Sequence, residues 1–258
     1  REAGILDGNK KYVEGRSVYD FWLYQWVGVD QMTGRSLYKI NYDKYVGSGE
    51  LSADDDRTRI PAAYLVEING KEYTTFDTYA EKNWSGSSIP KVYGSISASL
   101  GYKNLTLSAL MTYAAGGKVY DSVYQGLMIP ELAAMHKDIK NAWNGIPLGM
   151  TSDSPDRIDP DGVPENNLYW KSMTEGSSTR FLLDGSYMSL KYVSLSYSVP
   201  RSFAHRISLS DLAIGLNIEN IFTLSHKKGL NPQYSFGGST SNNMEMARIA
   251  TFSLNLTF

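Results

Sequence analysis

The sequence contains no cysteine and only three histidines among its 258 residues. The lack of Cys excludes disulfide bonds, thiolate metal sites and cysteine nucleophiles. The histidines (His136, His205 and His226) lie far apart and match no zinc-ligand spacing such as HExxH, so we expect no metal site. The formal net charge is only −2 and no basic run is present, which argues against nucleic acid as a partner.

The sequence also lacks long apolar runs and short catalytic motifs. No apolar stretch approaches the roughly 20 residues that a transmembrane helix needs. No GxSxG, P-loop or glycine-rich dinucleotide fingerprint is present, so we expect no catalytic residue and no cofactor. The chain opens on Arg1 without a start methionine or signal peptide, which suggests a processed product or a piece of a longer protein.

The sequence does contain long segments in which apolar and polar residues alternate. In RIATFSLNLTF (248–258), Phe252, Leu254 and Leu256 share one face, whereas Thr, Ser and Asn occupy the other. Four further segments show the same period of two: 92–102, 105–115, 192–199 and 212–218. This period is typical of a β-strand with one apolar face. Leu110 is an exception, because it stands among the polar positions of its segment.

These segments favour a transmembrane β-barrel over a soluble sandwich. Three of them have 11 residues and the other two have 8 and 7, close to the roughly 9–11 residues that a tilted strand needs to cross a bilayer. Apart from Arg248, the first residue of the last segment, the five segments contain no Asp, Glu, Lys or Arg. Their polar faces carry mainly small hydroxylated side chains. A soluble sandwich predicts strands of about five or six residues with charged outward positions. The fold class that we predict is therefore all-β, an antiparallel barrel with an apolar lipid face and a polar lumen.

The connections alternate in length, as in outer-membrane barrels with short periplasmic turns and long outer loops. Long links occupy about 28–91, 116–186 and 225–245, whereas Lys103-Asn104 and 200–210 are short. A hairpin at 63–79 would lie outside the membrane. We count about six crossing strands: 18–27, 91–102, 104–115, 187–199, 211–224 and 246–258. Because single-chain barrels begin at about eight strands, we expect a larger N-terminal portion to be missing or to form a separate chain.

The longest link should carry structure of its own. PELAAMHKDIKNAWNG (130–145) predicts a short helix, with Pro130 in its first turn and Gly145 at its end. Its apolar stripe comprises Leu132, Met135, Ile139 and Trp143. An acidic run follows, with Arg157 as its one cation: Asp153, Asp156, Asp159, Asp161 and Glu165. Its order does not match the EF-hand loop, so a solvated acidic turn is favoured over a calcium site, as it is for Asp54-Asp55-Asp56.

Several stretches together resemble one family. They are WVGVDQMTG (26–34), IPKVYGSISASLGYKNLTLS (89–108), AWNGIPLGM (142–150), FLLDGSYMSLKYVSLSYSVP (181–200), LAIGLNIENIFTLSHKKGLNPQ (212–233) and the terminal Phe258. In this order and spacing they are similar to the C-terminal third of SusC/RagA-type TonB-dependent transporters. One departure is Asn231-Pro232-Gln233, where many relatives carry an acidic triplet.

The resemblance implies that residues 1–258 form the C-terminal part of an outer-membrane barrel of about 22 strands with a plugged lumen. The plug, the TonB-contacting segment and the first strands would precede Arg1. A SusD-like surface lipoprotein would close over the barrel, and oligosaccharides or oligopeptides would be imported through TonB. The resemblance also implies that Phe258 is the aromatic C-terminal signal read by the barrel-insertion machinery. Because no catalytic motif is visible in the sequence, we expect that the protein is not an enzyme.

Aromatic residues are the candidates for ligand contact. In YDFWLYQWVGVD (19–30), Phe21 and Leu23 would face lipid, which would turn Trp22, Tyr24 and Trp26 toward the lumen, where flat rings stack on sugar or peptide faces. An interfacial aromatic girdle explains the same rings equally well. Further candidates lie in outer loops: Trp84, Tyr169 and Trp170. Trp143 is expected to pack against its own loop.

Two alternatives stay open. A surface-exposed β-rich domain for glycan binding or adhesion would need no transport role, and it would remain monodisperse without detergent. An outer-membrane enzyme would use a pair of loop carboxylates, as glycosidases do, although mobile loops position such pairs poorly.

Overall fold

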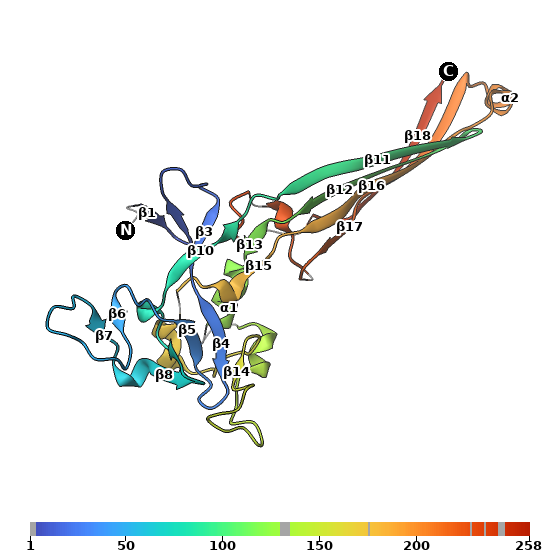
Figure 1. Ribbon diagram of the computed structural model, residues 1–258. Helices are drawn as coiled ribbons and strands as arrows, with labels where there is room; N and C mark the ends of the chain where they lie inside the picture. Colours follow the sequence, from blue (N-terminus) through green and yellow to red (C-terminus); the bar gives the residue numbers. More distant parts are fainter. Residues whose placement is uncertain (1–3, 130–134, 175, 228, 235, 242–245) are drawn as a thin grey trace. The chain divides into compact units, whose positions relative to one another are not determined.

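The computed structural model describes residues 4–129, 135–174, 176–227, 229–234, 236–241 and 246–258 (Figure 1). The chain divides into two compact units: the first comprises Arg1–Ser87 and Tyr120–Leu182, and the second comprises Ser88–Val119 and Leu183–Phe258. In the described ranges, no helix combines the length and apolarity that crossing a membrane requires.

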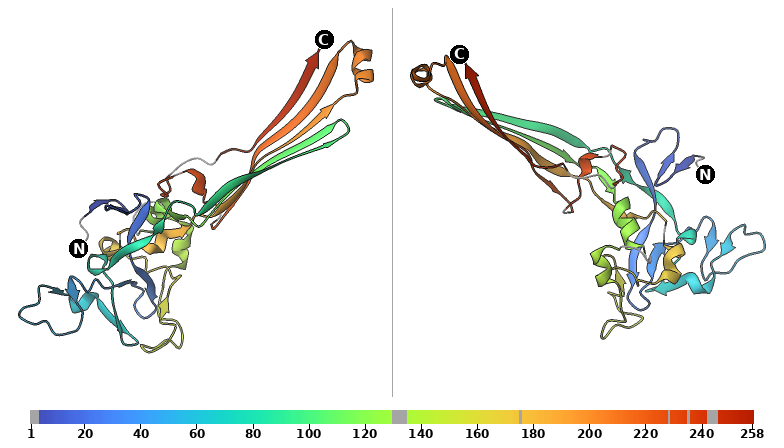
Figure 2. Two further views of the ribbon diagram at one scale, coloured as in Figure 1. Left: turned by 45° about the horizontal axis from the view of Figure 1, so that its top comes forward. Right: turned by 180° about the vertical axis from the view of Figure 1, so that it is seen from behind.

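The second unit is built on an antiparallel sheet of five long strands (Figure 2). In spatial order these are β11 (Val92–Tyr102), β12 (Leu105–Ala115), β16 (Tyr187–Ser198), β17 (Asp211–Ser225) and β18 (Ile249–Thr257). Each lies within three residues of a strand that the alternation predicts. Five of the six predicted crossing strands are therefore confirmed as strands of one sheet.

The strand register gathers the apolar side chains into continuous rows. One row across the sheet consists of Leu100, Leu107, Leu195, Leu216 and Phe252, each opposite the next. The adjacent row on the other face consists of Ser99, Ser108, Ser194, Asn217 and Thr251. Leu100 and Phe252 are each 68% exposed, so no described part of the chain covers the apolar face at these positions. The sheet thus has one apolar and one hydroxylated face, as the sequence predicts.

A β-bulge at Lys191 preserves these two faces where the sequence pattern changes phase. Leu110 lies opposite Tyr192, but Met111 lies opposite Leu190, so Lys191 has no counterpart on β12. The extra residue places Leu190 on the same face as Val193, although both cannot share a face in an unbroken strand. Leu110 pairs with Ser97 and Tyr192 on the hydroxylated face, as predicted.

The short connections are also confirmed. Tyr102 lies opposite Leu105 across the two-residue turn, in which Lys103 has a φ of 53°. The link from β16 to β17 contains α2 (Arg201–Ala204) and the 3₁₀ helix η6 (His205–Ile207). The longer link from β17 to β18 contains η7 (Pro232–Tyr234).

The first unit contains two small antiparallel sheets. The first has the order β1-β2-β3-β10, with β1 (Ile5–Asp7), β2 (Lys10–Tyr12), β3 (Asp20–Tyr24) and β10 (Lys82–Ser87). The second has the order β14-β4-β5-β9-β8, with β4 (Trp26–Asp30), β5 (Ser36–Lys39), β8 (Leu65–Ile68), β9 (Lys71–Thr74) and β14 (Ile158–Asp159). The predicted hairpin is β8–β9, whose turn residues Asn69 and Gly70 have φ values of 51° and 73°. Such left-handed pairs are typical of tight hairpin turns.

The other strands and helices are short. β6 (Tyr45–Val46) runs parallel to β7 (Thr58–Arg59), and β13 (Lys118–Tyr120) pairs with β15 (Leu182–Asp184). The helices of the first unit are η1 (Ala62–Tyr64), η2 (Asp77–Tyr79), α1 (Ser122–Met128), η3 (Lys137–Asn141), η4 (Leu168–Met173) and η5 (Thr179–Phe181). Asp121 caps α1 by accepting a hydrogen bond from the Tyr124 N–H at 3.2 Å.

The prediction of one crossing strand over 18–27 is wrong. The stretch is divided at Gln25 between β3 and β4, which belong to different sheets. Phe21 and Leu23 do not face lipid, because both are 0% exposed in a core with Tyr120, Met128 and Phe181. Alternation identified the apolar face of this stretch correctly. It could not show what covers that face, because a protein core and a bilayer both favour apolar side chains.

The predicted helix over 130–145 is also displaced. The α-helix of this link is α1, and the residues from Lys137 to Asn141 form a 3₁₀ helix instead. Pro130 and Leu132 lie outside the described residues. Trp143 packs on the β4–β5 turn and also contacts its own loop: its Nε1 donates to the Gln31 carbonyl at 2.9 Å, and its backbone N–H donates to the Val163 carbonyl at 2.9 Å. Gly34, at φ 71°, leaves the space for its ring, because a Cβ there would lie 2.4 Å from the indole.

Candidate ligand-binding site

The alternation of β3 sorts its side chains between the core and an open groove. Phe21 and Leu23 are buried, and the residues between and after them, Trp22 and Tyr24, point to the opposite side. Both line a groove of about 720 Å³ in the first unit. A volume of this size lies within the roughly 300–1,000 Å³ that is typical of small-molecule sites.

The pairing of β10 with β3 brings Trp84, which does not itself line the groove, against Trp22. The two residues lie directly opposite each other, and their ring centroids are 4.9 Å apart at an interplanar angle of 63°. Edge-to-face geometry is favourable for aromatic pairs. Three of the six predicted ligand-binding residues, Trp22, Tyr24 and Trp84, are thus brought together.

Cationic side chains cover the aromatic faces. The Lys11 ammonium lies 4.6 Å from the Trp22 ring centroid, Lys82 lies 4.3 Å from that of Tyr24, and the Arg16 guanidinium lies 4.5 Å from that of Trp84. Burial lowers the pKa of Lys82, although the charge of Asp77 opposes the shift. Burial also raises the pKa of the Tyr24 phenol, with Asp77 acting in the same direction.

The rest of the groove is polar and mixed in charge. Its other side chains include the cation Lys44, the carboxylates Asp43 and Glu81 and the carboxamides Asn41 and Asn83. Flat rings, amides and charges of both signs suit a flexible polar ligand with an apolar surface, such as an oligosaccharide or a peptide.

Trp26 does not belong to this groove. It lies in β4, where its ring packs edge-on against Tyr38 at 5.7 Å and 5.1 Å from the Arg180 guanidinium. Its Nε1 donates to the Pro160 carbonyl at 3.3 Å. The prediction that Trp26 shares a face with Trp22 is wrong, because the break at Gln25 ends the alternation between them.

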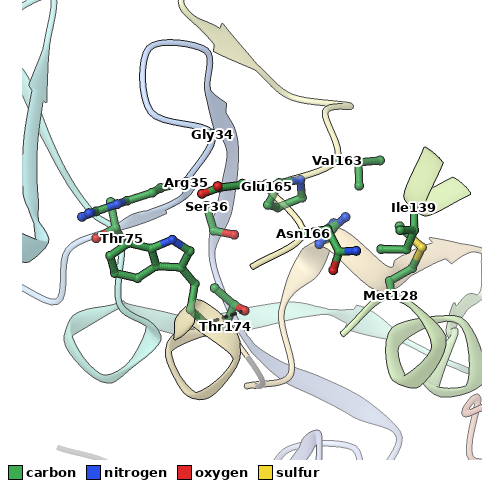
Figure 3. A pocket seen from close by; sticks show the side chains of 13 residues that line it. Gly34, Arg35, Ser36, Thr75, Met128, Ile139, Val163, Glu165, Asn166 and Thr174 are labelled. Carbon is green, nitrogen blue, oxygen red and sulfur yellow. Dashed lines mark hydrogen bonds between the residues drawn. The ribbon is translucent and has the colours of Figure 1, made fainter. Parts of the chain in front are cut away.

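Of the remaining loop candidates, Trp170 lines a second pocket of the first unit, and Tyr169 does not (Figure 3). The Trp170 ring lines it and carries the Arg35 guanidinium at 3.9 Å. Tyr169 is exposed and contacts Trp170 edge-on at 4.9 Å. In Figure 3, Met128, Ile139 and Val163 lie at one end of this pocket, and Arg35 and Thr75 lie at the other.

The acidic loop supplies an internal ion pair. Its Arg157 donates to both carboxylate oxygens of Asp30, at 2.8 and 3.1 Å, and Asp30 is 0% exposed. Burial alone would raise the pKa of Asp30, but hydrogen bonds from Arg157, the Met32 N–H and the Thr33 hydroxyl hold it below its ordinary value. In the described part of the chain, no group of three or more His, Cys, Asp or Glu is arranged to hold a metal ion.

Phe258 directly follows β18 and is 89% exposed. Its predicted role as an insertion signal depends on a machinery outside the chain and remains a prediction.

Sequence reasoning missed the cations that lie on the rings, and it missed Arg180. Lys11 and Lys82 lie on strands that flank β3, but their positions opposite the rings depend on the register of β2 and β10. Nothing in the sequence alone indicates that register. Lys82 could have been noted as a charge two residues from Trp84, a spacing that would place both side chains on one face of a strand, but the sequence analysis assigned this stretch to a loop.

Comparison with known proteins supports the fold. No protein-family model matches the chain. The chain is 26% identical over 226 residues to the TonB-dependent receptor P3 of Formosa agariphila, a match that covers 86% of this chain and 19% of the relative. Its structure is similar to that of the RagAB peptide transporter, with a TM-score of 0.69 and 18% identity over 100% of this chain and 25% of that one. For the RagAB peptide importer in the 'open-open' state the TM-score is 0.64, with 20% identity over 100% and 24%.

The chain therefore spans about a fifth to a quarter of the proteins that it matches. The comparisons confirm the predicted resemblance to SusC/RagA-type TonB-dependent transporters and the fold class, part of an antiparallel β-barrel.

Proposed function

We propose that this chain forms the C-terminal part of the barrel of an outer-membrane transporter, which imports oligopeptides or oligosaccharides with energy supplied through TonB. The similar proteins are described as a TonB-dependent receptor and as a peptide transporter, not as enzymes. A plug domain, further barrel strands and a TonB-contacting segment belong to the proposed whole protein. A SusD-like surface lipoprotein is its proposed partner, by analogy with the two-component name RagAB.

The observation that carries this proposal is the two-faced sheet of the second unit. A row such as Leu100, Leu107, Leu195, Leu216 and Phe252 extends across all five strands without a charged residue. Lipid is the solvent that such a face requires, and a row of hydroxyl and amide groups on the other face suits a water-filled lumen. The outer membrane is accordingly the proposed location, and Phe258 the proposed insertion signal.

The groove of the first unit is the proposed place of ligand contact. The rings of Trp22 and Tyr24 line it, Trp84 packs edge-on against Trp22, and the surrounding lysines and amides offer hydrogen bonds. Both sugar rings and peptide side chains stack on such surfaces.

Ligand capture and uptake by the intact protein test this function. We expect mass spectrometry to identify oligopeptides or oligosaccharides that co-purify with the protein from outer membranes. The double variant Trp22→Ala, Tyr24→Ala should retain much less of this material and slow its uptake by cells. A matched control is Tyr102→Ala, because Tyr102 is an exposed ring that pairs with Leu105 on the apolar face of the sheet.

Each alternative predicts a different result. A protein that stays monodisperse without detergent and supports no uptake would be a surface-exposed binding or adhesion domain. Hydrolysis of the co-purifying ligand by the intact protein would indicate an enzyme that uses loop carboxylates.

A further inference from the structure

The second pocket of the first unit is bordered by two residues with buried hydroxyl groups. Ser36 is 2% exposed and Thr75 is 4% exposed. The Ser36 hydroxyl lies beside the Tyr38 phenol, whereas the Thr75 hydroxyl has no hydrogen-bond partner among the described residues. Both residues line the pocket shown in Figure 3. A buried polar group without a partner is costly, so hydroxyls that border a cavity indicate a polar occupant.

Two guanidinium groups line the same pocket. Arg180 is partly buried, and its guanidinium lies 5.1 Å from the Trp26 ring and 4.9 Å from the Phe181 ring. Burial lowers its pKa, and among the described residues no carboxylate contributes to that pKa. Arg35 stacks on Trp170 and donates one hydrogen bond to the Ala63 carbonyl at 3.0 Å. An arginine carries five N–H donors, so both groups have donors beyond these contacts.

The polar lining of the pocket is therefore rich in hydrogen-bond donors and has a positive balance of charge. The lining residues include one carboxylate, Glu165, and two guanidinium groups, those of Arg35 and Arg180. Asn166 adds an exposed carboxamide. Guanidinium forks match the two oxygens of a carboxylate, and hydroxyls complete such a site as further donors.

The size of the pocket limits what it can accept. Its volume is about 30 Å³. One water-sized group needs about 10–15 Å³, so the pocket holds about two such groups, which matches the two oxygens of a carboxylate but not a whole sugar ring or amino acid.

We propose that the pocket formed by Ser36, Thr75, Arg35 and Arg180 binds a carboxylate group of the ligand and so anchors one end of it. This inference rests on the proposed function as an importer. The terminal carboxylate of an oligopeptide is the favoured source, because every peptide carries one and a neutral oligosaccharide carries none. The carboxylate of a uronic acid in an acidic oligosaccharide has the same chemistry and is distinguished by the test.

The test uses the intact protein purified in detergent from outer membranes. It is incubated with an equimolar set of synthetic octapeptides without acidic side chains, each as free acid and as C-terminal amide, and separately with oligogalacturonate. Bound material is measured by mass spectrometry after gel filtration. We expect free acids to be retained at least about tenfold more than amides, as charge-assisted hydrogen bonds from a guanidinium imply.

Variants assign this preference to the pocket. Arg180→Gln should abolish the preference for free acids, and Thr75→Val should reduce it severalfold. Arg201→Gln is the matched control, because Arg201 is an exposed arginine of α2 whose ion pair is with Asp211, and this variant should keep the full preference. If Arg180→Gln fails to fold, the proposal is tested by two measurements instead: the effect of Thr75→Val, and the ratio of retained free-acid to retained amide peptides in the wild-type protein.

Retention of amides as strongly as free acids would overturn the proposal, and so would an unchanged preference in both Arg180→Gln and Thr75→Val. Retention of oligogalacturonate alone, lost in Arg180→Gln, would support the carboxylate site and assign it to sugar acids. Uptake of the same octapeptides by cells is measured in parallel. Uptake that persists without any acid preference would refute only the subsite, whereas no uptake of any probe would refute the proposed function.

Discussion

The buried pair of Asp30 and Arg157 should determine whether the acidic loop stays attached to the β4–β5 hairpin. Arg157→Met removes both guanidinium bonds, at 2.8 and 3.1 Å, and leaves Asp30 with the Met32 N–H at 3.1 Å and the Thr33 hydroxyl at 2.9 Å. Because Asp30 is 0% exposed, an uncompensated carboxylate would remain in the interior. Breaking such a pair costs about 3–5 kcal/mol.

Hydrogen exchange of the intact protein measures this cost at one amide. The Gln31 N–H donates to the Arg157 carbonyl at 2.8 Å, so its exchange reports detachment of the loop. A cost of about 3–5 kcal/mol predicts exchange faster by about a hundredfold to a few thousandfold. The double variant Asp30→Leu, Arg157→Met should exchange more slowly than Arg157→Met alone, because it buries no unpaired charge. Arg57→Met is the matched control, because its ion pair with Asp55, at 2.7 Å, lies in another loop and is only partly buried, and it should leave this amide unchanged.

The same pair predicts a pH dependence. The pKa of Asp30 is lowered in the folded protein, so its contribution to stability is present above the ordinary carboxyl pKa of about 3.9. This contribution is lost as the pH falls through the lower folded value. Protection of Gln31 should therefore be constant between about pH 5 and 7 once the intrinsic exchange rate is corrected, and should decline below about pH 4. Unchanged exchange in Arg157→Met, or protection that increases on acidification, would refute the reasoning.

Two further predictions concern the core and the sheet. Phe21→Ala should destabilise the first unit by about 3–5 kcal/mol, seen as faster proteolysis of that unit, because the ring is fully buried against Tyr120 and Phe181; resistance equal to the wild type would contradict this. Leu216→Arg should destabilise the inserted barrel by about 2–4 kcal/mol in urea unfolding from liposomes if it faces the bilayer midplane. Asn217→Arg, on the other face of the same strand, should cost much less, and equal costs would contradict the assignment of faces.

The alternation of the sequence predicts the five-stranded sheet closely because a strand whose two faces meet different environments must suit both at once. Leu195 is apolar and its neighbour Ser194 is polar, and successive residues of a strand lie on opposite faces of the sheet. Their order along the chain therefore predicts which face each occupies. The bulge at Lys191 is visible in retrospect, because the apolar parity shifts between Leu190 and Val193.

The first unit was predicted less well, and for physical reasons. Phe21 and Leu23 alternate with polar neighbours just as lipid-facing residues do, but a packed core buries them instead. The candidates Trp22, Tyr24 and Trp84 were chosen by chemistry, since large rings with polar neighbours suit ligands, and their role in binding remains a prediction. The approach of Lys11, Lys82 and Arg180 to aromatic rings depends on tertiary packing, which local pattern does not encode.

Spin labels on the sheet test the central claim most directly. Labels at Leu100, Leu195 and Leu254 of the intact, membrane-inserted protein should be relaxed by oxygen, which concentrates in acyl chains. Labels at Ser99 and Ser194, on the opposite face, should be relaxed by a water-soluble nickel chelate. Access of the nickel chelate to the three leucine positions would show that water covers the apolar face, and it would contradict the barrel and the transport function proposed from it.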